Sequence, residues 1–330
     1  MLADSVLLRK PALRLYLTVT GKFRQTDNQT KTILNKMNIW RIHLKADSQA
    51  GIDQRQLCLD KGIVGVGWQI DYETVPVTWD EYWETAEGDY GDSSWKAAIN
   101  AIKNRIQVDD LIWTRDWSGN YFLGRILSDW YYDTDEDCSK ADIVNVRKCE
   151  WHKIGTEEAV PGKVVSSFRP ARTVQVIDDD TVYYFSQIAY NQKVGKSYYE
   201  VDNLAGEDIF SLLSTDGCED ALAIYLQVKQ DYHIIPSSCK DDTMTYEFEL
   251  KHRLTGKSAV VQVKSGWTAL NIDDYDKLDT DIFLFATSGQ YHGTPKPNIK
   301  TIDPDEIRKF LYEQTHLLPN KMKVWIELTR

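Results

Sequence analysis

Four side chains of the types used in metal-dependent hydrolysis lie close together in the sequence: Glu247, Glu249, Gln262 and Lys264. Hard divalent cations prefer carboxylate and amide oxygens as ligands, and a nearby ammonium group can stabilise charge that develops on a phosphate. The members of each pair are two residues apart, so each pair would share one face of a β-strand. The same residues also fit an exposed polar face on which Glu247 and Lys264 form an ion pair of little energetic consequence.

A β-hairpin would bring these four side chains together. Two alternating, apolar-rich runs flank a short polar segment that carries one glycine, and this pattern predicts a hairpin. A turn centred on Thr255-Gly256 places Glu249 opposite Gln262 and Glu247 opposite Lys264. Opposed residues of an antiparallel pair have Cβ atoms about 4.5–5.5 Å apart. The hairpin therefore predicts a compact polar patch.

The Gln-x-Lys motif at Gln262 and Lys264 ends an apolar run from Ala259 that is typical of a buried strand. This segment resembles the last motif of the PD-(D/E)xK nuclease superfamily, in particular its Mrr-like restriction branch, in which Gln often replaces the acid. The separation of 13 residues between Glu249 and Gln262 is typical of that branch. The resemblance implies that Glu249 holds Mg²⁺ or Mn²⁺ and that Gln262 is either the second metal ligand or positions the water. It also implies that Lys264 orients the attacking water or stabilises the phosphate.

Two further acids enter this comparison. The family usually has Asp at the position of Glu249, and Glu247 competes for the same role. Glu219 opens an apolar, helix-like run and matches the glutamate on the first helix of such nucleases, although acids favour the first turn of any helix. The resemblance covers roughly residues 210–315.

The composition is that of a globular protein, with 42% hydrophobic and 27% charged residues among 330. No run approaches the ~18 apolar residues that would span a membrane. The cysteines are Cys58, Cys138, Cys149, Cys218 and Cys239. Their number is odd and none is in Cys-x-x-Cys spacing, which argues against a zinc site and against a disulfide scaffold. This pattern indicates a reducing compartment, which we expect to be the cytoplasm. The net charge of −11 counts mildly against a nucleic-acid partner, but net charge does not describe a local groove.

The sequence from Met37 predicts many short strands and one or two helices, among them Trp95–Ile106. This combination indicates a small closed or nearly closed β-barrel. The order of its motifs resembles the EVE-like members of the PUA-like superfamily over about residues 37–175. That likeness depends on these segments: Gly62–Trp68, Asp109–Arg115, Tyr121–Ile126 and Val160–Phe168. Such domains flip a base or bind a modified nucleotide in an aromatic pocket.

The resemblance places the pocket aromatics on Trp68 and near Trp113 or Trp117. A flipped base is held by stacking between aromatic or apolar faces and by hydrogen bonds to its Watson–Crick edge. Stacking on one aromatic ring contributes about 1–3 kcal/mol. Each tryptophan also fits a structural role, because a Trp buries ~150–250 Å² in a core.

The chain is predicted to be a two-domain protein of the α/β and α+β classes. We expect an extension over residues 1–36 (or a strand from Leu13 to Val19), an EVE-like domain over 37–177, an ordered linker over 178–210 and a nuclease domain over 211–330. The first domain would be a PUA-like β-barrel with helices. The second would be a restriction-endonuclease-like α/β sandwich around a mixed sheet.

The two resemblances together imply a type IV-like restriction endonuclease that cuts DNA carrying a modified base. A homodimer is expected, because restriction of duplex DNA usually needs two active sites, and no membrane partner is expected. The alternative is a binding protein for a modified nucleotide in DNA or RNA, with the second domain a degenerate nuclease fold. A third interpretation is an RNA-directed nuclease.

Overall fold

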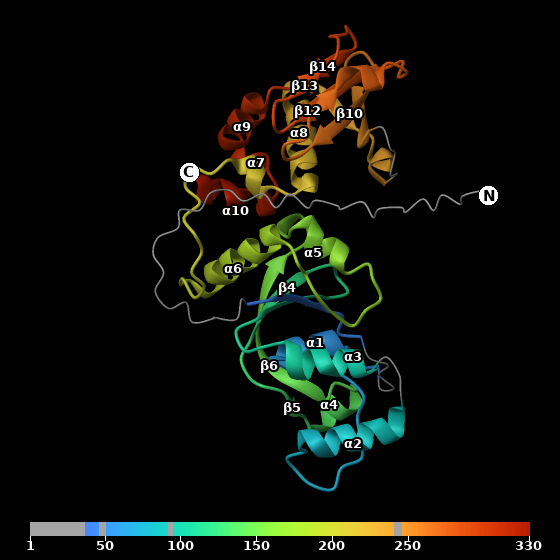
Figure 1. The fold of residues 1–330 in the computed structure, drawn as a ribbon, viewed down its shortest axis with the longest axis vertical. Coiled ribbons are helices and arrows are strands. Elements are labelled where there is room, and N and C mark those ends of the chain that lie inside the picture. The colour runs from blue at the N-terminus through green and yellow to red at the C-terminus, as the bar shows by residue number, and fades with distance from the viewer. Residues whose placement is uncertain (1–36, 46–50, 92–94, 241–245) are drawn as a thin grey trace, which may run out of the picture. The chain divides into compact units, whose positions relative to one another are not determined.

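The computed structural model describes residues 37–45, 51–91, 95–240 and 246–330 as a mixed α/β protein with two main sheets (Figure 1). The expected extension over residues 1–36 and the alternative strand from Leu13 to Val19 lie outside the described residues. No helix in the described ranges is both long enough and apolar enough to cross a membrane.

The first sheet has seven strands in the order β2-β6-β4-β3-β1-β7, with β5 paired to β6. Only the β1–β3 pair is parallel. The sheet curves as a half barrel, so the structure shows part of the barrel that the sequence predicts. The strands are β1 (Ile39–Ile42), β2 (Ile63–Val66), β3 (Leu111–Arg115), β4 (Tyr121–Ile126), β5 (Tyr131–Tyr132), β6 (Asn145–Gly155) and β7 (Val174–Val176).

The predicted helix at residues 95–106 is present but changes its winding halfway. An α-helical part, α3 (Trp95–Asn100), continues as a π-helical turn, η1 (Ala101–Arg105). The guanidinium of the buried Arg147 donates to the carbonyl oxygens of Ile102 (2.6 Å) and Lys103 (2.9 Å). The sheet therefore supplies hydrogen bonds to the carbonyl groups of this turn. The other helices of this part are α1 (Gln54–Lys61), α2 (Trp79–Tyr90), α4 (Glu136–Lys140), η2 (Glu157–Ala159) and α5 (Gly162–Ser167).

The segment expected to be a linker, residues 178–210, contains a long helix, α6 (Asp180–Val194). Asp179 caps it by accepting a hydrogen bond from the N–H of Val182 at 2.9 Å. Its buried Phe185 stacks on Trp113 of β3, with ring centroids 6.4 Å apart. This segment is therefore packed against the first sheet.

The second sheet has the order β14-β12-β10-β9-β8. The β8–β9 and β9–β10 pairs are antiparallel, whereas the β10–β12 and β12–β14 pairs are parallel. Its strands are β8 (Tyr232–Ile234), β9 (Phe248–His252), β10 (Ser258–Lys264), β12 (Asp281–Ala286) and β14 (Ile299–Thr301). A small sheet pairs β11 (Leu270–Asn271) with β13 (Tyr291–His292).

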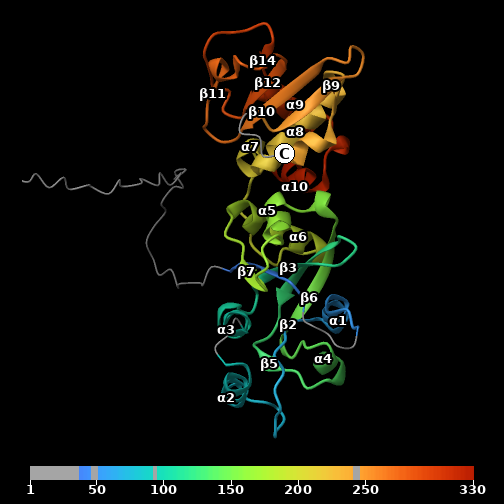
Figure 2. The same ribbon diagram turned by 90° about the vertical axis from the view of Figure 1, so that its right-hand side faces the viewer.

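Helices α8 and α9 lie against one face of the second sheet (Figure 2). Asp303 caps α9 and Pro304 is its first residue, as the sequence predicts. The helices and 3₁₀ turns of this part are α7 (Ile209–Leu212), α8 (Thr215–Lys229), η3 (Pro236–Lys240), η4 (Ile272–Tyr275), α9 (Pro304–Glu313), η5 (Thr315–Leu317) and α10 (Asn320–Thr329).

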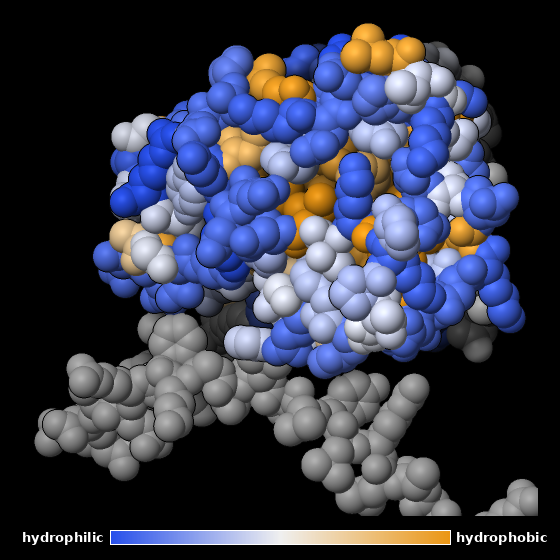
Figure 3. All heavy atoms as spheres, turned by 90° about the horizontal axis from the view of Figure 1, so that it is seen from above, coloured by the Kyte–Doolittle hydropathy of each residue, from blue (hydrophilic) through white to orange (hydrophobic). Residues whose placement is uncertain are grey.

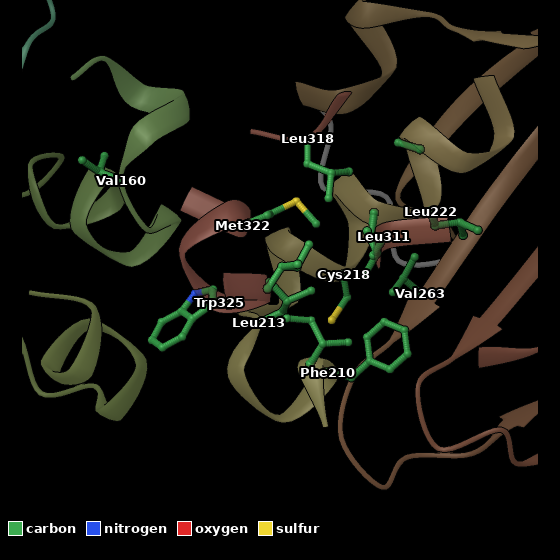
Figure 4. Packing of buried hydrophobic residues seen from close by; sticks show 14 of the residues in the cluster. Val160, Phe210, Leu213, Cys218, Leu222, Val263, Leu311, Leu318, Met322 and Trp325 are labelled. Carbon is green, nitrogen blue, oxygen red and sulfur yellow. The ribbon is translucent and has the colours of Figure 1, made fainter. Parts of the chain in front are cut away.

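Strand β10 is buried on both faces, as its apolar sequence predicts. Val261 and Val263 belong to the same buried cluster as Cys218 and Leu222 of α8 (Figure 4). On the other face, Val260 belongs to a second cluster with residues of β11, η4 and β12. Viewed from above, the protein is mainly hydrophilic, with apolar atoms in several separate patches, some near the middle of the face and some at its upper edge (Figure 3). Because its neighbours in β10 are buried apolar residues, Gln262 is a polar residue in an otherwise apolar stretch of the strand.

The hairpin of β9 and β10 has a different register from the one that the sequence predicts. Glu249 lies opposite Val260, not opposite Gln262. The connection has four residues, Arg253–Gly256, because the N–H of His252 bonds to Lys257 across its base at 2.9 Å. Gly256 has φ +68°, a conformation that favours glycine. The two extra loop residues shift the pairing by two, which keeps the predicted face but changes the partners.

Candidate functional site

The shifted register brings Glu247 to Gln262. The side-chain amide of Gln262 donates to Oε1 of Glu247 at 2.5 Å and to the carbonyl of Val263 at 3.2 Å. Gln262 is only 4% exposed. The backbone N–H of Glu247 also bonds to Val261 at 2.8 Å, so the acid is fixed at the end of the β9–β10 ladder. A carboxylate and a buried amide thus meet near the carboxyl end of β10.

Helix α8 begins beside this end of β10. Its first residue, Thr215, makes a side-chain hydrogen bond of 3.1 Å with Ser265, which directly follows β10. Glu219 lies in the second turn of α8. Burial raises the pKa of Glu219 to about 7, and the negative charge of Glu247 adds to the rise, whereas Lys264 opposes it. Glu219, Glu247 and Lys264 are therefore close enough to interact electrostatically.

Glu249 does not take the position that the sequence predicts. Its Oε1 accepts a hydrogen bond from the Tyr246 hydroxyl at 2.8 Å, and its backbone N–H donates to Ser238 Oγ at 2.8 Å. Because Val260 is its cross-strand partner, Glu249 does not lie directly opposite Gln262, as the predicted metal pair would require. Of the two glutamates left open by the sequence, the structure favours Glu247.

The donor set at this position suits a hard divalent cation. Glu219 and Glu247 offer carboxylate oxygens, and Gln262 has an amide oxygen. Mg²⁺ usually keeps several waters and needs only one or two carboxylates from the protein. Within the described ranges no group of three or more His, Cys, Asp or Glu side chains is arranged to hold a metal ion. Two carboxylates and one amide match the small number of protein ligands that Mg²⁺ usually takes.

The first sheet separates the three predicted base-binding tryptophans. Trp113 is fully buried, its indole N–H donates to Ser186 Oγ at 2.9 Å, and its ring packs on Phe185. This ring has no surface for a nucleobase, so the prediction for Trp113 does not fit the structure. Trp117, two residues beyond the end of β3, is 71% exposed. Trp68 is half-buried and lines a hollow.

The hollow at Trp68 has a volume of about 240 Å³. Trp68 and Asp142, which both line it, have positive φ angles of 64° and 50°. Such strained backbone costs about 1–3 kcal/mol per residue and is concentrated at functional sites. The volume lies below the ~300–1,000 Å³ of pockets for drug-sized ligands, so the hollow suits a single ring system. Asp142 is a lining residue that the sequence did not single out.

A second hollow, of about 520 Å³, adjoins the first and shares His43, Lys45 and Thr173 with it. Trp117 and Phe168 contribute aromatic rings to its lining, and arginines line much of the rest. These residues come from separate segments of the chain. No local motif could have grouped them, so only their positions in the folded chain show the hollow.

A sequence family described as a domain of unknown function (DUF8426) matches residues 40–174. That range runs from β1 into β7 and includes both hollows of the first sheet, whereas Glu219, Glu247, Gln262 and Lys264 lie outside it. The chain matches no curated protein and no solved structure. Over residues 40–174, the chain is thus similar to a domain whose function is not known.

Proposed function

We propose that this protein is a metal-dependent endonuclease that hydrolyses DNA phosphodiester bonds. The observation that carries the proposal is the 2.5 Å contact between Gln262 and Glu247 at the end of a buried strand, with Glu219 and Lys264 within electrostatic reach. An amide, two acids and an amine are the groups that the resemblance to Mrr-like nucleases requires. Here Glu247 takes the role that the sequence assigned first to Glu249.

Each residue has a separate task in this proposal. Glu247 and Glu219 bind the cation, and rotation of the Gln262 amide would turn its oxygen toward the same point. When bound, Mg²⁺ or Mn²⁺ supplies Lewis-acid stabilisation of the phosphate oxygens. The ammonium of Lys264 orients the attacking water and stabilises the negative charge that develops on the phosphate.

The order of elements supports this proposal. Helix α8, which carries Glu219, precedes the antiparallel strands β8, β9 and β10, and the parallel strand β12 and helix α9 follow. This is the α/β arrangement that a restriction-endonuclease-like domain requires. The likeness concerns the order and direction of the elements.

We also propose that the first sheet selects DNA with a modified base. The Trp68 hollow has the volume of a single ring system, an aromatic wall and the carboxylate of Asp142 in its lining. These are the features with which enzymes hold a base that has left the duplex. Trp117 lines the adjoining hollow, and in this proposal it supplies the second aromatic ring that the sequence predicts.

A cleavage screen tests the proposal. The full chain is incubated with Mg²⁺ or Mn²⁺ and genomic DNAs that carry different base modifications, beside unmodified DNA and RNA. We expect cleavage of at least one modified DNA, its loss in EDTA, and its loss in Lys264→Ala. Lys251→Ala, an exposed lysine on β9, is the matched control and should cleave normally. Cleavage of RNA without cleavage of any DNA would show that the substrate is RNA and not DNA.

The second candidate is a binding protein with a degenerate nuclease fold. It is favoured by the small donor set, since the described residues offer no group of three His, Cys, Asp or Glu side chains for a metal. Tight binding of modified DNA by the wild type, with no cleavage under any metal, would support this candidate and refute the endonuclease.

A further inference from the structure

The hollow at Trp117 contains a concentration of positive charge. Four basic side chains line it: Lys45, Arg55, Arg115 and Arg169. The single lining carboxylate is Asp116, whose oxygens accept hydrogen bonds from the backbone and side chain of Asn120 at 2.8 and 2.7 Å. A chain with a net charge of −11 therefore places an excess of cations around one hollow of about 520 Å³.

Arg55 is the most unusual of these residues. Its side chain is only 6% exposed, and its guanidinium stacks on the Trp117 ring at 4.0 Å. No residue in the described part of the chain accepts a hydrogen bond from this guanidinium, and the opposing charges of Asp53 and Asp116 act only at longer range. Buried cations are normally paired, because an unpaired one forfeits its hydration. Because Arg55 lines the hollow and its side-chain N–H donors have no acceptor in the described part of the chain, an anion in the hollow would satisfy them.

The pKa values of two residues, Arg41 and the lining residue His43, reflect the same positive charge. Burial, together with the charges of Arg115 and Arg172, lowers the pKa of Arg41 to about 10. Burial likewise lowers the pKa of His43 to about 4, with additional repulsion from Arg41 and Arg115. His43 is therefore neutral at pH 7. An anion in the hollow would offset the repulsion among these cations.

We propose that this hollow binds a backbone phosphate of a nucleic-acid strand, and that Trp117 stacks on a neighbouring base. The hollow is much larger than a lone phosphate needs, and the 71% exposed ring of Trp117 offers a surface for a base. Because it shares His43, Lys45 and Thr173 with the Trp68 hollow, a nucleotide could place its base in one and its phosphate in the other. This inference deepens the proposed function, on which it rests for the kind of ligand.

Binding of a labelled, unmodified single-stranded oligonucleotide in EDTA tests the inference. These conditions prevent metal-dependent cleavage and involve no modified base, so the result is independent of the cleavage screen. Arg55→Gln should weaken binding roughly tenfold, as expected for loss of charge-assisted hydrogen bonds. It should also reduce the slope of log affinity against log salt by about one. The measurement is fluorescence anisotropy across a salt series.

The matched control is Arg105→Gln. Arg105 also lies over a tryptophan ring, at 5.0 Å from Trp40, but it does not line the hollow. The Arg105→Gln variant should bind the oligonucleotide as the wild type does. Arg169→Gln removes an exposed charge and so tests the hollow without risk to folding; it should weaken binding in the same way as Arg55→Gln.

Three results would overturn the inference. One is wild-type affinity and salt slope in both folded variants, Arg55→Gln and Arg169→Gln. Another is an equal loss of affinity in Arg105→Gln, which would show only diffuse electrostatic attraction. The third is displacement of the strand by equimolar inorganic phosphate, or binding of inorganic phosphate without binding of the strand, since either would identify a free anion as the ligand.

Discussion

The choice between two neighbouring glutamates shows what a residue pattern can and cannot establish. Alternation places Glu247 and Glu249 on the same face as Gln262 and Lys264, and the structure agrees. The sequence could not choose the pairing, because a two-residue and a four-residue loop predict different partners for the same face. The hydrogen bond from Gln262 to Glu247 distinguishes the two acids.

The two acids therefore predict different phenotypes. Glu247→Gln should lower the rate of cleavage on the order of a hundredfold, because it removes a carboxylate proposed to bind the metal. Glu249→Gln should retain most of the activity, because this side chain bonds to Tyr246 instead. Single-turnover cleavage of a modified DNA measures both. If Glu249→Gln lowered the cleavage rate more than Glu247→Gln, Glu249 and not Glu247 would be the metal ligand.

Glu219 predicts a pH dependence of stability in the metal-free protein. A carboxyl group whose pKa is raised to about 7 in the folded state contributes stability below its unfolded value, near 4.5, and loses it as the pH rises through 7. Glu219→Gln removes the buried charge that faces Glu247, Asp216 and Asp220. It should raise the melting temperature in EDTA at pH 8 by about 1–2 °C and have little effect at pH 5.

The exposed Glu207 provides the control for this measurement. Glu207→Gln should not show a gain that appears between pH 5 and pH 8. If Glu219→Gln stabilises the protein equally at both pH values, the gain does not come from ionisation, and the electrostatic link between Glu219 and Glu247 is refuted.

At the scale of elements, regular patterns were informative and aromatic-rich segments were not. The sequence predicted the β3–β4 and β9–β10 hairpins, the buried strand β12 and the cap of α9. It missed α6, because the aromatic run that begins at Tyr183 resembles strand composition and the preceding acids resemble a turn. One of those acids, Asp179, is the helix cap, a signal that was present in the sequence.

The cap of α6 can be tested directly. Asp179→Ala should lower the free energy of unfolding by about 1 kcal/mol, because the N–H of Val182 loses its acceptor. Asp178→Ala changes the same residue type one position earlier, at an exposed site, and should change stability much less. Urea denaturation of both variants gives the comparison. Equal losses would show that general charge, and not the cap, matters here.

At the scale of the whole molecule, the predicted nucleic-acid contacts depend on local charge. The net charge of −11 opposes DNA in general, so binding should be confined to surfaces such as the hollow of Arg55 and Trp117. The sequence contained these basic residues but could not show that they gather, because α1, the β3–β4 turn and the segment after α5 meet only in the folded chain. The net charge alone therefore does not show where cations gather in the folded protein.

Binding and cleavage should be separable, because the two candidate sites belong to different sheets. In EDTA, Glu247→Gln should bind a modified DNA within roughly a factor of two of the wild type. Arg55→Gln should bind it more weakly and, at saturating DNA, still cleave it when metal is added. Anisotropy and cleavage assays on the same preparations test this. Loss of binding in Glu247→Gln would indicate that the site in the second sheet also holds the strand.

The four-residue connection from Arg253 to Gly256 also limits how this protein can diverge. Successive side chains of a strand face opposite ways, so slippage of the ladder by one position would turn Glu247 away from Gln262, whereas replacement of residues within the connection would not. If the proposed function is right, we expect homologous chains that preserve this parity to cleave DNA and chains that break it to bind without cleaving. A comparison of connection lengths would sort homologues into these two groups before any assay.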